Sequence, residues 1–156
     1  MLSQRINRVG GVEHMQLLAA SVAEAAKGGL TLLLYGELGA GKTTFTQALA
    51  KSLGITQPVT SPTFTIAGEY EVTNHGSIRT LCHVDLYRFE GRQAQDDPLV
   101  REILEHAQDS NRLTVIEWAD KLGRVDLPNV WKLTFMHGMN EGERIVDITQ
   151  VNTLGL

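Results

Sequence analysis

The segment Gly36–Thr43, GELGAGKT, has the residue types and spacing of a phosphate-binding loop, G-x-x-x-x-G-K-[ST]. Glycines let successive backbone N–H groups point into one concavity, where they bind phosphate oxygens. Lys42 adds a mobile positive charge for the β- and γ-phosphates, and the Thr43 hydroxyl can bind Mg²⁺. We therefore predict a nucleotide site with a magnesium ion, formed by Glu37, Leu38, Gly39, Ala40, Gly41, Lys42, Thr43 and Thr44.

The elements on either side of this loop are the ones that a phosphate site requires. Leu30–Tyr35 is a short apolar run after a glycine pair, which is typical of a buried parallel strand. Thr43–Leu53 has apolar residues at helical spacing and is followed by Gly54, a common helix terminator. A strand, a glycine loop and a helix favour a nucleotide site over the alternative, a glycine-rich turn before an ordinary helix.

Two acidic residues follow other apolar runs and could help to hold the metal. Glu117 follows Leu113–Ile116, and Asp85 ends a second such run. In open α/β sheets the ligand crevice lies at the carboxyl ends of the parallel strands, so Glu117 is well placed if its strand is parallel to Leu30–Tyr35, whereas the sequence does not fix the direction of the strand that Asp85 ends. Both acids are candidate metal ligands and catalytic residues together with Lys42. The alternative for each is a solvated acid at a strand end. His83 lies on the same side of its strand as Asp85, so it either orients this acid or is a packed histidine.

The rest of the chain predicts an α/β fold with a mixed sheet. No helix separates Phe64–Val72 from Ile78–Asp85, so these two strands are expected to pair antiparallel. The predicted order is helix, strand, helix, two strands, helix, three strands. We expect a P-loop NTPase fold, a three-layer sandwich in a single domain over residues 1–156. The other predicted elements are a helix at Val12–Lys27, a helix that starts at Asp97–Pro98 with Leu99 in its apolar stripe, and a hairpin of Val130–Met136 with Arg144–Thr149.

Composition excludes several classes of protein. The 156 residues include 42% hydrophobic residues, which fits a globular chain rather than a disordered one. A net charge of −4 argues against direct binding of nucleic acid by phosphate neutralisation. The single cysteine, Cys82, rules out an internal disulfide framework and is expected to be a buried, inert thiol. Residues 1–10 lack an apolar signal core and no run reaches membrane-spanning length, so the expected location is the cytoplasm.

A phosphate loop is compatible with four functions. The absence of the guanine-binding pattern N/T-K-x-D argues against a GTPase switch. A small-molecule kinase suits the loop and the chain length, but no arginine-rich lid is evident between Arg88 and Arg112. A nucleotide-gated binding module without turnover is a further alternative. The fourth function, hydrolysis of ATP under the control of partner proteins, is the one that the family resemblance described next implies.

Four motifs in order resemble those of the TsaE (YjeE) family of bacterial ATPases: GELGAGKTT, SPTFT, HVDLYR and VIEWADK. The resemblance implies a P-loop fold with antiparallel strands, and ATP and Mg²⁺ as cofactors. It also implies a role with TsaB and TsaD in forming threonylcarbamoyladenosine (t6A) at tRNA adenosine 37. The ATPase would allow repeated turnover of the complex and would meet tRNA only through its partners.

The same resemblance assigns roles to residues by motif. Lys42 and Thr43 would bind phosphates and Mg²⁺, while Asp85 and Glu117 would serve the metal and the attacking water. Two segments depart from the family pattern, FEGRQAQDDPLVREIL after LYR and Met136–Glu143, and both could alter partner contacts. A switch-like loop and residues near the nucleotide or the partner surface are implied at Thr63, Tyr87, Arg88 and Trp118.

Overall fold

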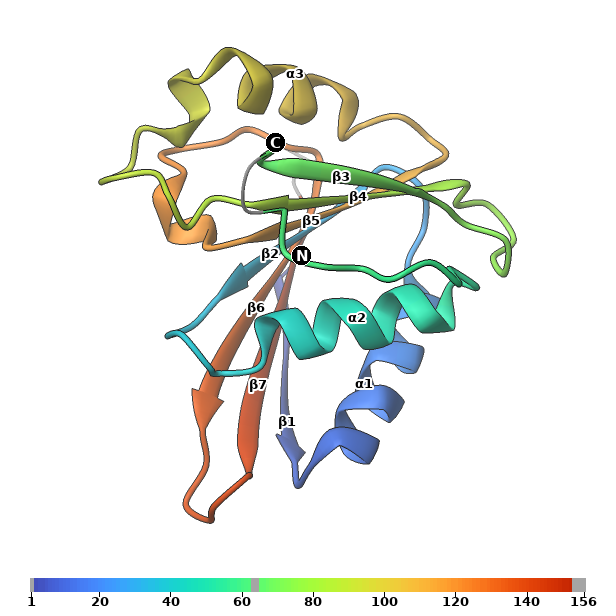
Figure 1. Ribbon diagram of the computed structural model, residues 1–156, viewed down its shortest axis with the longest axis vertical. Helices are drawn as coiled ribbons and strands as arrows, with labels where there is room; N and C mark the ends of the chain where they lie inside the picture. Colours follow the sequence, from blue (N-terminus) through green and yellow to red (C-terminus); the bar gives the residue numbers. More distant parts are fainter. Residues whose placement is uncertain (1, 63–64, 153–156) are drawn as a thin grey trace.

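A computed structural model describes residues 2–62 and 65–152. Over these residues the chain forms one seven-stranded sheet in the order β1-β7-β6-β2-β5-β4-β3, with helices on both faces (Figure 1). The α/β class and the mixed sheet are therefore as predicted. The strands are β1 (Leu2–Val9), β2 (Leu30–Tyr35), β3 (Ala67–Glu71), β4 (Thr80–Asp85), β5 (Arg112–Glu117), β6 (Asn129–His137) and β7 (Arg144–Asn152). The helices are α1 (Val12–Ala25), α2 (Lys42–Ser52) and α3 (Pro98–His106), with short 3₁₀ turns η1 (Ala94–Asp96) and η2 (Ala119–Lys121).

Four neighbouring strands, β6, β2, β5 and β4, run parallel, and the outer strands β1, β7 and β3 run antiparallel to their neighbours. The direction of β4, which its sequence did not reveal, is thus the same as that of β2. Parallel strands end at the same edge, and Asp85 of β4 is the register partner of Glu117 of β5. Both predicted acids therefore lie beside the loop that follows β2.

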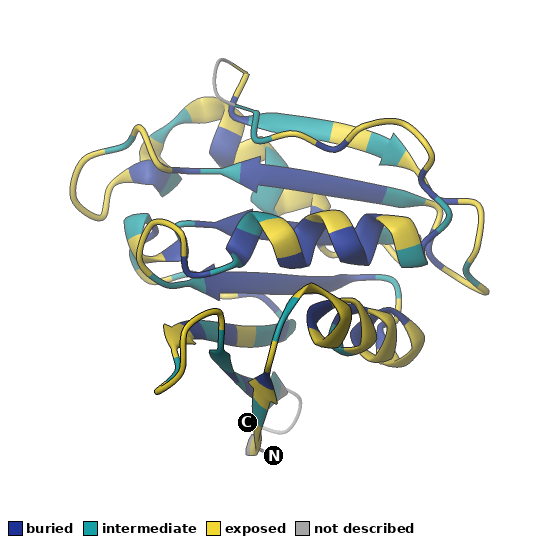
Figure 2. Cartoon of the chain, turned by 60° about the horizontal axis from the view of Figure 1, so that its bottom comes forward, coloured by how far each residue is buried: buried dark blue, intermediate teal, exposed yellow. Residues whose placement is uncertain are grey.

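The helices divide the core into two layers. α1 and α2 cover one face of the sheet, where Phe45, Leu49 and Leu133 are fully buried. α3 covers the other face, where Val100 packs with Ile116 of β5. Figure 2 shows central strands that are buried along their length, and helices that alternate between buried and exposed residues. A sheet covered on both faces explains why β2 and β5 read as continuous apolar runs rather than as alternating ones.

Local chemistry sets the ends of the helices. The Asp97 carboxylate accepts hydrogen bonds from the backbone N–H groups of Leu99 (2.9 Å) and Val100 (3.3 Å), and Pro98 occupies the first turn, as the sequence predicts. After α2 the chain turns at Gly54, whose φ is 77°. A Cβ atom there would lie 2.4 Å from the Thr73 hydroxyl oxygen, so only glycine fits this close approach.

Several predictions of the fold were incomplete or wrong. Strand β1 was not predicted, because it is an edge strand with mostly polar, exposed residues. Leu99 was predicted to belong to the buried stripe of its helix, but it is 40% exposed, and Val12 at the start of α1 is 63% exposed; each lies in the first turn of its helix. Strand β3 starts at Ala67, and the predicted start at Phe64 lies outside the described residues. No helix in the described part of the chain is long and apolar enough to span a membrane.

Candidate functional site

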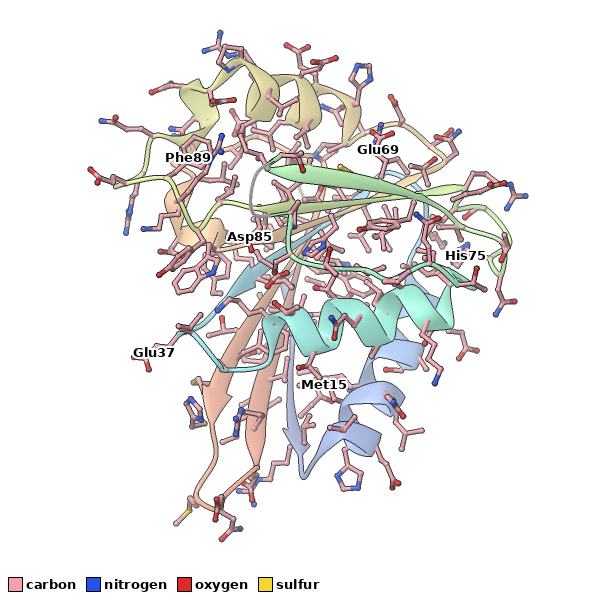
Figure 3. All side chains as sticks on the ribbon, in the orientation of Figure 1. Met15, Glu37, Glu69, His75, Asp85 and Phe89 are labelled. Carbon is pink, nitrogen blue, oxygen red and sulfur yellow. The ribbon has the colours of Figure 1, made fainter. Side chains whose placement is uncertain are left out.

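The phosphate loop between β2 and α2 depends on glycine at two positions. Gly36 has a φ of 148°, and a Cβ atom there would lie 2.8 Å from the backbone oxygen of Phe135 on β6. Gly41 has a φ of 112° and caps the start of α2, so the first N–H groups of the helix face the cleft. Glu37 is exposed at the outer tip of the loop and points away from the sheet (Figure 3). The loop has the left-handed turns that a phosphate cradle requires.

Lys42 lies buried against its own loop. Its ammonium group donates hydrogen bonds to the backbone oxygens of Gly36 and Glu37, the latter at 2.9 Å, and lies 4.1 Å from the ring centroid of Trp118. Burial lowers the pKa of the Lys42 ammonium, while the carboxylates of Glu117, Asp120 and Asp85 oppose this effect. A phosphate would offer this desolvated charge a stronger partner than two neutral carbonyl groups.

Glu117 is almost completely buried, at 1% exposure, and both of its oxygens are engaged. Oε1 accepts a hydrogen bond from the Thr43 hydroxyl at 2.9 Å. Oε2 lies 2.5 Å from Nε2 of His83, which is 0% exposed. His83 does share a face with Asp85, but the acid that it contacts is Glu117, because the side chain reaches diagonally across to β5. Of the two alternatives for His83, the structure therefore shows the packed, hydrogen-bonded histidine, and the acid that it holds is Glu117 rather than Asp85.

Asp85 is half-buried and lines the same cleft. Its Oδ1 accepts a hydrogen bond from the backbone N–H of Tyr87 at 2.9 Å, which orients the carboxylate at the end of β4. The rings of Tyr87 and Trp118 lie beyond it with centroids 5.1 Å apart. Trp118 adopts a left-handed backbone with a φ of 57°, directly after Glu117. A strained residue next to a buried acid is a common feature of functional sites.

A cleft of about 570 Å³ joins these groups. The structure brings together the predicted residues Leu38, Gly39, Gly41, Lys42, Thr43, Thr44, Asp85, Tyr87, Arg88, Glu117 and Trp118 along its wall. Glu37 and Ala40 do not line it; Ala40 is buried, and its N–H donates to the backbone oxygen of Glu37 at 3.1 Å. Thr63 lies outside the described residues, although Ser61 and Pro62 of the same loop line the cleft.

The cleft extends past the loop to residues that sequence reasoning missed. This far end is formed by the corner between β1 and α1 and by the start of β7. Arg144 is anchored there, with Nη2 donating to the backbone oxygen of Gly39 at 3.3 Å. The one available signal was the pair Gly10-Gly11 before the first predicted helix, because adjacent glycines allow a close approach. The lining residues of this end are Val9, Gly10, Gly11, Val12, Met15, Gly142 and Arg144.

The donor atoms at the floor of the cleft fit magnesium only in the presence of a nucleotide. Among residues 2–62 and 65–152, no three His, Cys, Asp or Glu side chains gather closely enough to hold a metal ion. The Thr43 hydroxyl and the carboxylates of Asp85 and Glu117 nevertheless all line the cleft, and Thr43 and Glu117 are in direct contact. Mg²⁺ is usually held by one or two carboxylates together with phosphates and water, so this set fits it as a partner of bound phosphate.

Comparison with known proteins agrees with this arrangement. The family model described as threonylcarbamoyl adenosine biosynthesis protein TsaE matches residues 10–146. A TsaE protein of a Nostoc species is 37% identical over 136 residues, which cover 86% of this chain and 79% of the relative. A TsaE protein of Streptomyces coelicolor is 32% identical over 91% of this chain and 90% of its own length. The crystal structure of YdiB from Bacillus subtilis superposes with a TM-score of 0.70 at 31% identity, and covers 97% of this chain and 88% of that one. These matches and the geometry of the phosphate loop together establish that the chain belongs to the TsaE family.

Proposed function

We propose that this protein is a magnesium-dependent ATPase that regulates or resets the protein complex making threonylcarbamoyladenosine in tRNA. The observation that carries the proposal is the contact of Thr43 with Glu117 beside the buried Lys42, at the floor of the cleft. Lys42 and Thr43 lie in the first turn of α2, and Glu117 ends β5. A lysine, a hydroxyl and a carboxylate in this arrangement are the groups that phosphoryl transfer needs.

Hydrolysis would proceed by in-line attack of water on the γ-phosphate, and each residue has a distinct task. Lys42 and the N–H groups at the start of α2 would stabilise the charge that develops on the phosphate oxygens. Asp85, half-exposed in the cleft, would hold the attacking water, while Glu117, whose oxygens are already engaged, would serve the metal side. Thr43 and Glu117 would hold Mg²⁺, which neutralises phosphate charge when bound.

The far end of the cleft is where the adenosine part would lie. The γ-phosphate has to reach Lys42, Asp85 and Glu117, so the base extends in the opposite direction, past Gly39, toward the β1–α1 corner. That corner offers two glycines and the apolar side chains of Val12 and Met15, which suit the face of a purine. Arg144 would lie close enough to contact the base or the ribose.

The partners proposed are TsaB and TsaD, with tRNA reached only through them, in the cytoplasm. Support comes from the names of the relatives, which describe biosynthesis of tRNA threonylcarbamoyladenosine. The exposed Tyr87 and Arg88 at the rim of the cleft are the residues through which a partner would sense the nucleotide. Their position at the end of β4, beside Asp85, would couple partner contact to hydrolysis.

Phosphate release from Mg-ATP, measured with the protein alone and with its TsaB and TsaD added, tests this function. We expect slow release alone, strong stimulation by the partners, and loss of both in Lys42→Ala. Tight ATP binding with no release under either condition would instead favour a nucleotide-gated binding module. Consumption of ATP only after a small-molecule acceptor is supplied, with formation of a phosphorylated product, would favour a kinase.

A further inference from the structure

The pair formed by His83 and Glu117 links the interior of the sheet to the cleft. His83 is on β4 and Glu117 ends β5, and Nε2 lies 2.5 Å from Oε2 with both side chains buried. The other carboxylate oxygen, Oε1, accepts from Thr43 on the first turn of α2. A chain of two hydrogen bonds therefore runs from the centre of the sheet to the helix that would bind phosphate.

The ring proton of His83 can be assigned from burial. Its other ring nitrogen, Nδ1, is buried and has no hydrogen-bond partner among the described residues. A buried N–H without an acceptor costs more free energy than a buried lone pair, so we assign the proton to Nε2. His83 then donates, and an Oε2 atom of an ionised Glu117 accepts.

Stability alone gives little reason for such a pair. The cost of removing a carboxylate from water is comparable to the attraction that a buried partner returns, and apolar pairs of similar volume are often as stable. The arrangement does have a clear geometric effect, because it holds one oxygen of Glu117 inside the sheet. Only Oε1 then faces Thr43 and the cleft.

We propose that His83 is a positioning residue: its Nε2–H holds Oε2 of Glu117, so that Glu117 presents one oxygen, in one orientation, toward the metal and phosphate site. This inference rests on the proposed function, since it assumes that a metal–nucleotide complex binds at Thr43. Groups that orient a metal-binding carboxylate typically change metal affinity or activity about 10- to 100-fold when they are removed.

The test is the magnesium dependence of nucleotide affinity, measured by calorimetry with ADP and with a non-hydrolysable ATP analogue, each with and without Mg²⁺. In His83→Leu we expect the gain in affinity from Mg²⁺ to fall about tenfold, with magnesium-free affinity unchanged. His83→Gln, whose side-chain amide reaches about the position of Nε2, should retain most of the gain. Thr114→Val on β5, which removes a buried hydroxyl without a described partner, is the matched control and should leave the gain unchanged.

Two outcomes would overturn the role of His83: a normal magnesium gain in His83→Leu, or equal losses in the Leu and Gln variants. If His83→Leu does not fold, as judged by thermal unfolding, His83→Asn replaces it, because the shorter amide stops near the position of Nδ1. A retained gain in Gln with a lost gain in Asn supports the proposal, and equal gains refute it. A wild-type protein that binds no nucleotide would refute the proposed function itself. A wild type that binds nucleotide but releases no phosphate would refute only hydrolysis, and the magnesium gain would still test His83.

Discussion

The two ends of the cleft are built in opposite ways. At the phosphate end, Lys42 and Glu117 are buried and their polar atoms are engaged by hydrogen bonds from the loop, α2 and β4. At the far end, Gly10 and Val12 are exposed. Among the described residues that line this end, Arg144 is the charged one, and it donates a hydrogen bond to the backbone oxygen of Gly39. A buried, charged end suits the phosphates, which are the same in every nucleoside triphosphate. An open, apolar end tolerates differences in the base.

This contrast predicts the largest effect for Lys42→Ala. The substitution removes a desolvated charge that no neighbour can replace, so kcat/KM for Mg-ATP should fall about 1000-fold and tight binding should be lost. Steady-state phosphate release and calorimetry measure the two effects. Lys51→Ala, an exposed lysine on the same helix, should leave both values unchanged. Normal ATP affinity in Lys42→Ala would contradict the proposal that this end of the cleft binds the phosphates.

The next effect belongs to Glu117→Gln, which retains the shape of the side chain but removes its charge. We expect hydrolysis to fall about 100-fold and the affinity for the Mg-nucleotide to fall less, by about tenfold, because a carboxylate on the metal side matters most when charge develops on the transferred phosphate. Glu69→Gln on β3 breaks an exposed ion pair with Arg112 and is the control that should behave as wild type. Equal losses of hydrolysis and binding would identify Glu117 as a structural acid only.

Cys82 on β4 is buried in the core next to the phosphate end of the cleft, so thiol reagents should reach it slowly in the folded protein. Burial raises the pKa of the Cys82 thiol to about 11, so at pH 8 the reactive thiolate is rarer than in the unfolded chain by about 100-fold. Maleimide labelling followed by mass spectrometry should be slow in the native protein and fast in urea, with no other cysteine to confuse the signal. Because the folded pKa is raised, the thiol's contribution to stability is present below its unfolded pKa and is lost as the pH rises toward 11. Rapid native labelling would show that this core opens.

The smallest effect is expected at the open end, in Arg144→Met. The apolar stem of the side chain is kept while its charge is lost, so KM for ATP should rise about three- to fivefold, with kcat unchanged. Arg101→Met on α3 removes an exposed arginine of the other layer and should change neither constant. A fall in kcat comparable to that of Glu117→Gln would contradict the separation of the two ends.

The two ends of the cleft also differ in how far their residues could be predicted from the sequence. β2, the phosphate loop and α2 follow one another in the chain, so spacing and glycine placement were sufficient to locate Lys42 and Thr43. Glu117 could be expected nearby if its strand ran parallel to β2, because parallel strands end at the same edge. The direction of β4 could not be read from the sequence, so the position of Asp85 was left open. The residue that contacts Glu117 could not be predicted, since His83 reaches it across the strand register, which no local pattern encodes.

The far end eluded prediction for a related reason. Strand β1 has no continuous apolar face, and its partner β7 lies at the other end of the chain, so neither periodicity nor spacing indicates their pairing. Val12 has the helical spacing of buried residues, but it is the first residue of α1 and is 63% exposed. Its place in the first turn of the helix, and not its residue type, decides its exposure.

Pairing of the first strand with the last also has a consequence for synthesis. Leu2 of β1 is the register partner of Val151 of β7, so β1 leaves the ribosome without a partner strand and can pair only after nearly all of residues 2–151 have been made. The phosphate loop and its helix, in contrast, are contiguous and emerge together. A nascent chain would thus contain the phosphate loop and α2 before β1 could pair with β7 and complete the far end of the cleft. Both the phosphates and the base of ATP could be bound only after that pairing.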